Sequence, residues 1–170
     1  MNDVIIRPAT HSDLEAVNRI YNYYIEHTAI TFDVEPWSLE KRAEWFTHYG
    51  TAGRHRCLVV EPGGAVAGYA TSSPLRPKAA YATSVETSVY LAPALTGRGP
   101  GSRLYQALFD LLACEDVHRA YAIIALPNPA SIQLHLRFGF RSVGVLSEVG
   151  RKFGCWHSTE WFEKAFTSEA

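Results

Sequence analysis

The chain has 170 residues, of which 47% are hydrophobic, with a mean hydropathy of -0.09 and a formal net charge of -1. These values fit one globular domain with a sizeable core, so we predict a single domain over residues 1–170. The near-neutral charge gives no electrostatic reason to expect nucleic acid or an anionic membrane as a partner.

No apolar run approaches the ~18 residues that a membrane-spanning helix needs. The first residues also lack the basic start and the long apolar region of a secretory signal. We therefore expect a cytoplasmic protein without a membrane partner.

Short strands and amphipathic helices alternate along the first half of the chain. Thr10 and Asp13 form a capping-box pattern that predicts the start of one helix, and Ser38 can cap a second. Pro62-Gly63-Gly64 separates two apolar segments and favours a hairpin. In order, we predict a strand at residues 4–7, a helix ending near 26, a partly buried loop at 28–37, a helix at 39–49 and hairpin strands at 57–60 and 66–71.

The second half continues this alternation after a polar loop that contains prolines. We predict, in order, that loop at 72–82, a strand at 85–91, a glycine-rich loop at 97–101, a helix at 103–114, a strand at 120–126, a helix at 128–138 and closing strands at 140–146 and 159–166. Strands interleaved with helices predict an α/β or α+β sandwich around a single sheet.

The glycine-rich loop lies between a predicted strand and a predicted helix. Gly97, Gly99 and Gly101 alternate there with Arg98 and Pro100. Glycines let the backbone approach an anion closely, and the following helix supplies free amides and the positive end of its dipole. We therefore predict a cradle for a pyrophosphate, with an ordinary glycine turn as the alternative.

Two familiar phosphate-binding patterns do not fit this loop. A Walker loop needs Lys after its glycine, and no Lys follows here. A dinucleotide fingerprint would need Gly at position 100 or 102, where Pro100 and Ser102 stand. A nucleotide-dependent phosphate-transferring enzyme stays an alternative, although it would use a Lys and metal-binding carboxylates that are missing beside the loop.

A second pattern lies on the last predicted helix. Asn128, Ser131 and His135 stand at offsets 0, 3 and 7, and those positions share one face of an α-helix. Both patterns resemble the GNAT superfamily of N-acetyltransferases, whose loop reads Gln/Arg-x-x-Gly-x-Gly/Ala and whose helix reads Asn-x-x-Ala-x-x-x-Tyr-x-x-x-Gly-Phe. Thr96 departs from the first loop position, and His135 stands where the family usually has Tyr.

This resemblance implies acetyl-CoA as the cofactor and no metal. It also implies a single mixed, mostly antiparallel sheet flanked by helices, with a central pair of strands, the fourth and fifth, that splay apart around the pantetheine arm of the coenzyme. The coenzyme-binding residues that it implies are Val89, Tyr90, Leu91, Gly97, Arg98, Gly99, Pro100, Gly101, Ser102, Asn128 and Ser131.

Further residues over essentially the whole chain resemble the phosphinothricin and methionine sulfoximine N-acetyltransferases of that superfamily. The tail pattern is Gly150-x-Lys152-Phe153-Gly154-x-Trp156-His157. The resemblance implies a small amino acid or analogue as the substrate, and a homodimer, which the aromatic segments 28–37 and 156–166 favour. The substrate-binding residues that it implies are Phe32, Arg76, Lys78, Tyr81, Glu86, Thr87 and Ser88, with the two cations facing the substrate's acidic group.

Glu86 and His135 are the candidate catalytic residues. Glu86 lies on a strand that is otherwise apolar at alternate positions, where it is either solvated or, as the resemblance implies, the base that deprotonates the substrate amine. His135 is a proton donor to the leaving thiolate, a second base or a buried helix histidine. A coenzyme-binding sensor without turnover is the non-catalytic alternative.

The cysteines and tryptophans receive structural interpretations. We expect Cys57 and Cys114 to pack as small apolar residues, and Cys155 as an acyl-carrying nucleophile is a rival mechanism. Cys155 and His157 lack the second ligand pair of a metal site. The tryptophans are expected in the core or an interface, with Trp156 as the one candidate for stacking on a ligand.

Overall fold

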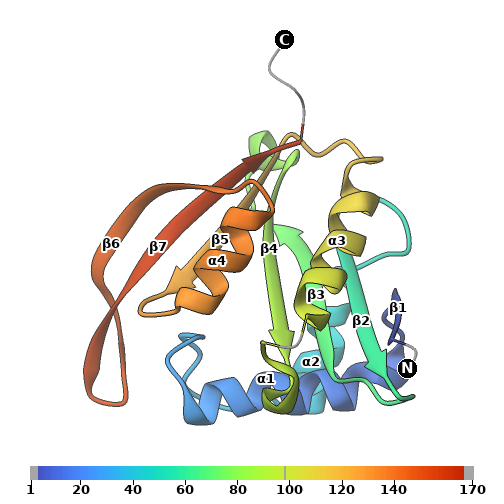
Figure 1. Cartoon of the computed structure of the whole chain (residues 1–170), viewed down its shortest axis with the longest axis horizontal. Helices are drawn as coiled ribbons and strands as arrows, with labels where there is room; N and C mark the ends of the chain where they lie inside the picture. The colour runs from blue at the N-terminus through green and yellow to red at the C-terminus, as the bar shows by residue number, and fades with distance from the viewer. Residues whose placement is uncertain (1–3, 98, 167–170) are drawn as a thin grey trace.

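The computed structural model describes residues 4–97 and 99–166, which form one mixed sheet with helices on both faces (Figure 1). In that part of the chain the strand order is β1-β2-β3-β4-β5-β7-β6, and neighbours are antiparallel except for the parallel pair of β4 and β5. The strands are β1 (Val4–Pro8), β2 (Arg56–Pro62), β3 (Gly68–Pro74), β4 (Ser84–Leu91), β5 (Arg119–Ala125), β6 (Arg141–Lys152) and β7 (Cys155–Ala165). The predicted sandwich around a mostly antiparallel sheet is confirmed.

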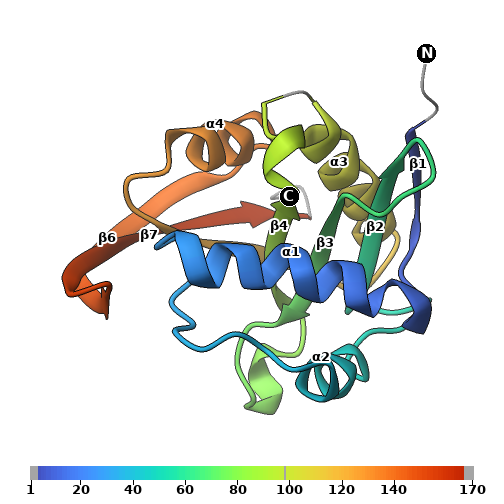
Figure 2. The same ribbon diagram turned by 90° about the horizontal axis from the view of Figure 1, so that it is seen from below.

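Helices α1 and α2 cover one face of the sheet, and α3 and α4 cover the other (Figure 2). Both predicted caps form, because Asp13 accepts a hydrogen bond from the Thr10 amide at 2.7 Å and Ser38 accepts one from the Lys41 amide at 3.2 Å. The helices are α1 (Leu14–His27), α2 (Leu39–Phe46), α3 (Pro100–Leu112) and α4 (Pro129–Arg137), and the short 3₁₀ helices are η1 (His11–Asp13), η2 (Ala79–Tyr81) and η3 (Pro93–Leu95).

Two buried clusters fix the helices to the sheet. Leu104, Leu108 and Leu112 recur at helical spacing on α3 and are completely buried against the sheet. On the opposite face, Val17 and Ile20 of α1 pack with side chains of β2 and β3. Burying a side chain of this size stabilises a fold by about 1.5–3 kcal/mol, so helix packing holds β4 and its neighbours from both sides.

Strands β4 and β5 separate part of the way along their length (Figure 1). Their parallel register runs from Ser84 opposite Arg119 to Glu86 opposite Tyr121, whereas β4 continues beside β3 as far as Leu91. Among the described residues, no strand pairs with this side of β4 beyond Glu86, so an extended ligand can take the hydrogen bonds of these backbone groups. This confirms the splayed central pair.

The C-terminal hairpin of β6 and β7 is longer than predicted. The two strands meet at Phe153-Gly154, a two-residue turn whose φ angles of 52° and 77° suit a type I′ hairpin. Irregularities between positions 142 and 144 and between positions 146 and 150 interrupt the pairing along β6, and nearly all of that strand is exposed. Regular alternation of apolar and polar residues, the usual signal of a strand, is therefore missing there.

Three local predictions need correction. Helix α3 starts at Pro100 rather than at residue 103, because proline suits the first helical position. Helix α2 ends at Phe46 rather than near Tyr49, since tighter turn bonds replace the helical ones there. Cys57 is buried as expected, but Cys114 follows the end of α3 and is exposed.

Candidate active site

A cleft of about 530 Å³ opens at the gap between β4 and β5. Its walls come from β4, β5, the glycine loop, the first turn of α3 and α4. The residues predicted to bind the coenzyme that line it are Val89, Tyr90, Leu91, Gly97, Gly99, Gly101, Ser102, Asn128 and Ser131. Pro100 is buried and does not line the cleft, and Arg98 lies outside the described residues. Three separate segments of the sequence thus converge on one cleft.

The glycine loop adopts backbone conformations that favour glycine. Gly97 and Gly99 have φ angles of 76° and 95°, and Gly99 is the N-cap of α3. Gly101 lies in the first turn of α3 rather than in the loop, and a Cβ there would be 3.2 Å from Cδ1 of Leu91. Pro100 has no N–H, and the amides of Ser102 and Arg103 donate to the Gly99 carbonyl at 3.1 Å and 3.3 Å. What α3 offers to an anion in the cleft is therefore the Gly101 amide and the positive end of the helix dipole.

Asn128 is the N-cap of α4 rather than part of its first turn. Its Oδ1 accepts a hydrogen bond from the Ser131 amide at 3.2 Å, so Nδ2 is the group that it can offer to a ligand in the cleft. Ser131 and His135 lie one turn apart and face the same cleft. The predicted polar face is present, with Asn128 at its N-terminal edge.

His135 is 3% exposed, and both of its ring nitrogens already have hydrogen-bond partners. Nδ1 lies 2.7 Å from the Ser131 carbonyl oxygen and so carries the proton, which leaves Nε2 to accept from the Tyr105 hydroxyl at 2.9 Å. Burial lowers the pKa of His135, and the bond to the Ser131 carbonyl opposes that shift. The Tyr105 hydroxyl lies 3.2 Å from the hydroxyl of Thr87, so the neutral imidazole is linked through the buried Tyr105 to Thr87, which lines the cleft.

A second cavity, of about 320 Å³, lies on the face of the sheet that α1 and α2 cover. Alternate side chains of a strand point to the same face, and Glu86, Ser88 and Tyr90 of β4 line this cavity. Thr87, predicted to contact the substrate, faces the other way and lines the larger cleft. The residues that line both spaces are Ile30, Ser88, Tyr90, Ile123 and Ala125, so the two cavities meet where β4 and β5 separate.

Glu86 stands at the edge of this gap, because it is the last residue of β4 that pairs with β5. Within the described residues it is the one carboxylate that lines the smaller cavity. Burial raises the pKa of Glu86, and the positive charge of Arg76 opposes the shift. A carboxylate with a raised pKa is a better proton acceptor for an amine than an exposed one is.

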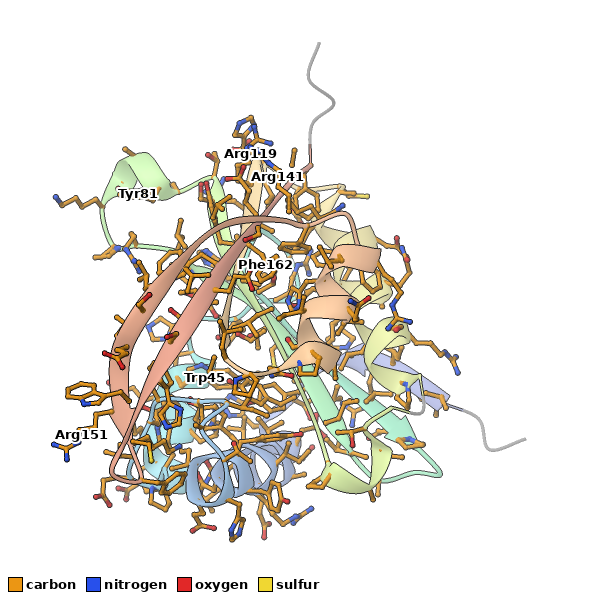
Figure 3. All side chains as sticks on the ribbon, turned by 60° about the vertical axis from the view of Figure 1, so that its left-hand side comes forward. Trp45, Tyr81, Arg119, Arg141, Arg151 and Phe162 are labelled. Atoms are coloured by element: carbon orange, nitrogen blue, oxygen red, sulfur yellow. The ribbon has the colours of Figure 1, made fainter. Side chains whose placement is uncertain are left out.

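The basic segment before β4 lies farther from this cavity than predicted. Arg76, Lys78 and Tyr81 are exposed, and the cavity around Glu86 is not lined by any of the three. Tyr81, on η2, lies well away from Trp45, which belongs to the cavity wall (Figure 3). Of the three residues, Arg76 is the one whose charge acts on the cavity, because it opposes the rise that burial causes in the pKa of Glu86.

The loop at residues 28–37 supplies another wall of the cavity, including the predicted Phe32. Nζ of the buried Lys152 donates a hydrogen bond to the Thr31 carbonyl at 2.7 Å. Gly150 faces the Phe32 ring so closely that a Cβ at that position would overlap it. The tail pattern around Gly150 and Lys152 therefore holds this loop against the cavity.

Much of the remaining wall is aromatic and was not expected from the sequence. The sequence indicates Trp37 and Trp45 as core or interface residues and Trp156 as a ligand stacker, whereas Trp37 and Trp45 line the cavity and Trp156 is 60% exposed on β7. Arg42 of α2 also lines it. Its one sequence signal is the spacing of three residues to Trp45, which places both on one helix face but is equally typical of a packed core.

Alternative chemistry considered from the sequence has no support in residues 4–97 and 99–166. No group of three or more His, Cys, Asp and Glu side chains there is arranged to hold a metal ion. Cys155 is free and exposed and lines neither cavity, so it does not suit the acyl-carrying role. Within the same ranges, every helix is too short or too polar to cross a membrane.

Comparisons with known proteins agree with this geometry. The family model described as the acetyltransferase (GNAT) domain matches residues 6–161. A phosphinothricin N-acetyltransferase of Streptomyces coelicolor is 52% identical over 164 residues, which are 95% of this chain and 96% of that protein. An L-methionine sulfoximine/L-methionine sulfone acetyltransferase of Pseudomonas aeruginosa is 35% identical over 151 residues, which are 89% of this chain and 88% of that protein.

The fold has a solved counterpart. A GNAT superfamily phosphinothricin acetyltransferase from Sinorhizobium meliloti, in complex with acetyl-CoA, has a TM-score of 0.89 and 30% sequence identity to this chain. The similarity covers 97% of this chain and 89% of that one. It therefore extends over nearly the whole chain.

Proposed function

The chain belongs to the GNAT acetyltransferase family, and we propose that it acetylates the α-amino group of a small amino acid or amino-acid analogue. As a member of that family it is an acetyltransferase whose acetyl donor is acetyl-CoA. The observation that carries the substrate class is the cavity at Glu86, which is of a size for a small molecule and meets the larger cleft at the strand gap. Relatives named for phosphinothricin and methionine sulfoximine support an amino acid with an additional tetrahedral group.

In this proposal acetyl-CoA occupies the larger cleft with its pyrophosphate at the glycine loop. The positive φ angles of Gly97 and Gly99, the Gly101 amide and the positive end of the α3 dipole suit an anion there. The pantetheine arm would run beside β4 beyond Glu86, where the strand has no partner, with Nδ2 of Asn128 on the α4 side. A soluble donor of this kind is consistent with the cytoplasmic location that we also propose.

Glu86 would act as the general base. Free α-amines are mostly protonated at neutral pH, so the nucleophile must lose a proton before it attacks. Glu86 takes that proton, directly or through water, and the amine nitrogen forms a bond to the thioester carbon. A backbone amide near Val89 stabilises the resulting oxyanion. The carbon–sulfur bond then breaks, the nitrogen gives up its second proton to solvent, the thiolate takes up a proton, and the products are the N-acetyl amino acid and free coenzyme.

His135 fits a positioning role better than the proton donor considered from the sequence. Its two nitrogens are engaged by the Ser131 carbonyl and the Tyr105 hydroxyl, and its lowered pKa keeps it neutral at physiological pH. We propose that it fixes Tyr105, and through it Thr87, against the cleft. The thiolate would then receive its proton from water or from a hydroxyl in this chain.

The predicted cations Arg76 and Lys78 stay candidates for contacts with the substrate's acidic group. Arg76 has the stronger case, because its charge already acts on Glu86 across the intervening space. Both side chains are exposed on the segment before β4, where cations attract an acidic substrate over a distance of about a Debye length, ~8–10 Å.

We also propose a homodimer in which the hairpin of β6 and β7 forms the contact. The hairpin extends to one side of the helices, and β6 is an edge strand of the sheet (Figure 1). An exposed edge and an apolar surface favour association with a second copy. The hairpin carries large apolar side chains that are 46% to 61% exposed, namely Val143, Val145, Leu146, Val149, Phe153 and Trp156. Light scattering at micromolar concentration should give twice the monomer mass, and a fully active monomer would contradict the proposal.

A thiol-release screen tests the function itself. Purified protein and acetyl-CoA are mixed with L-phosphinothricin, L-methionine sulfoximine, L-methionine sulfone and the ordinary amino acids, and free thiol is followed over time. We expect thiol release with one or more of the three analogues that carry a tetrahedral phosphorus or sulfur group. Mass spectrometry should then show the N-acetyl product. If acetyl-CoA raises the melting temperature but no amino acid releases thiol, the protein is a coenzyme sensor instead.

A further inference from the structure

Arg42 is the most deeply buried cation in the described part of the chain, with an exposed fraction of 1%. It lies on α2 and lines the smaller cavity together with Glu86. Its Nε donates a hydrogen bond to Oδ1 of Asn18 at 3.2 Å. No Asp or Glu of the described residues forms a salt bridge with it, so the guanidinium carries an unpaired charge inside the protein.

Unpaired hydrogen-bonding atoms gather around this same cavity. Buried Nη2 of Arg42, Nε1 of Trp37 and Oγ1 of Thr159 each lack a partner among the described residues, and all three residues line the cavity. A buried donor without a partner destabilises the fold, and a charged donor does so more strongly. Donors left unpaired on one cavity wall are typical of a site whose acceptor arrives with a ligand.

The aromatic rings around Arg42 explain its position but not its missing acceptor. The guanidinium carbon lies 4.3 Å, 4.4 Å and 4.8 Å from the ring centroids of Trp37, Trp45 and Tyr21. Such rings stabilise a desolvated cation and hold its plane, yet they do not accept the in-plane N–H groups. The residue is therefore fixed in advance, with donors left over for a planar or tetrahedral oxyanion.

We propose that Arg42, assisted by Nε1 of Trp37, binds the oxyanion of the amino-acid substrate, either its α-carboxylate or an acidic group on its side chain. The inference rests on the proposed function. Glu86 and Arg42 lie on two walls of one cavity, and we assign them to the amine and to the oxyanion of one substrate molecule. The substrate amine lies toward Glu86 at the strand gap, and its oxyanion lies toward Arg42. Arg42 then selects for a substrate that carries an oxyanion, in addition to any contact that the exposed cations before β4 make.

Arg42→Met tests this with Lys41→Met as the matched control. Lys41 is the neighbouring residue of α2, and its ammonium lies 4.2 Å from the Trp37 ring centroid, but it is exposed and does not line the cavity. Substrate binding in the presence of CoA is measured by calorimetry, and KM and kcat by thiol release. We expect Arg42→Met to weaken binding and raise KM roughly 10- to 100-fold with a smaller change in kcat, and Lys41→Met to leave both near wild type.

Three probes separate the two sources of the oxyanion. L-Phosphinothricin carries a carboxylate and a phosphinate, L-methionine sulfone only the carboxylate, and the carboxamide of L-methionine sulfone neither. If Arg42 binds the α-carboxylate, Arg42→Met weakens the binding of L-phosphinothricin and L-methionine sulfone but not that of the carboxamide. If it binds the side-chain acid, only L-phosphinothricin is weakened. An unchanged set of constants, or an equal loss for all three probes, would overturn the proposal.

Two further variants keep the test decisive if Arg42→Met fails to fold. Arg42→Lys keeps the charge without the planar fork and should recover part of the affinity, while Trp37→Phe keeps the ring, removes Nε1 and should weaken binding several-fold. Normal binding in both variants would overturn the assignment. A different result would contradict the proposed function itself. If the wild-type protein neither binds nor acetylates any of the probes, both the proposed function and the role of Arg42 are wrong.

Discussion

Replacing Glu86 by Gln keeps the shape of the side chain and removes the base. The expected loss of kcat/KM for removal of a general base is about 10²- to 10⁴-fold, which corresponds to about 2.7–5.4 kcal/mol of transition-state stabilisation. Acetyl-CoA affinity should stay near wild type, because the side chain of Glu86 lines the smaller cavity and not the larger cleft. Thiol release and calorimetry measure the two quantities, and exposed Glu44→Gln on α2 is the control.

The role of Glu86 as a base also predicts how kcat/KM changes with pH. Glu86 works as a base only when it is deprotonated, and burial raises its pKa, so wild-type kcat/KM should fall on acidification at a pH above the ordinary carboxyl value of about 4.3. The Gln variant should lose this limb of the profile. A variant that keeps nearly full activity over the whole acid range would refute the assignment of the base.

The same raised pKa predicts an effect on stability. The folded protein binds the Glu86 proton more tightly than the unfolded chain does, so stability falls as the pH rises from the ordinary carboxyl pKa through the raised one, and the loss persists above it. Each unit of elevation costs about 1.4 kcal/mol at neutral pH. Glu86→Gln should therefore melt at the wild-type temperature or above it while it loses activity, which separates a lost base from a damaged fold.

Three further variants test the surrounding walls. Gly101→Val adds a side chain to the first turn of α3, where it crowds Leu91, and should weaken acetyl-CoA binding by calorimetry while it lowers the melting temperature without unfolding the domain. His135→Phe leaves the buried Tyr105 hydroxyl without its acceptor and should cost about 1–3 kcal/mol, or roughly 3 to 10 °C in melting temperature, with a smaller loss of kcat than Glu86→Gln. Gly150→Ala displaces the Phe32 ring and should raise KM for the amino acid while the affinity for acetyl-CoA stays unchanged.

The coenzyme side of the site could be predicted because its determinants are local in the sequence. Gly97 and Gly99 have the positive φ angles that a glycine-rich loop indicates, and Asn128, Ser131 and His135 follow helical periodicity. Interactions within about ten residues determine these features, so their spacing can be read directly. The error at Gly101 concerned a helix boundary, which local signals define least well.

The amino-acid side could not be predicted in the same way, because distant segments build it. Arg42 comes from α2, Trp37 from the preceding loop, and Thr159 from the other half of the chain, on β7. Each residue alone has the ordinary pattern of a packed helix, a loop or a strand. Lys152 and Gly150 hold this loop, and they belong to a hairpin whose central part has no alternating pattern. The sequence therefore showed the tail pattern but not its contact with the loop at residues 28–37.

In the function that we propose, the register of β4 lets one strand face both substrates. Successive side chains point to opposite faces, so Glu86 and Ser88 face the amino-acid cavity while Thr87 faces the coenzyme cleft. A slip of one residue would exchange the two sets and remove the base from the cavity. Pairing with β3 sets the register on one side, and the short parallel pairing with β5 ends at Glu86 on the other. The proposed base, Glu86, therefore stands at the first point where a thioester in the strand gap and an amine from the opposite face would meet.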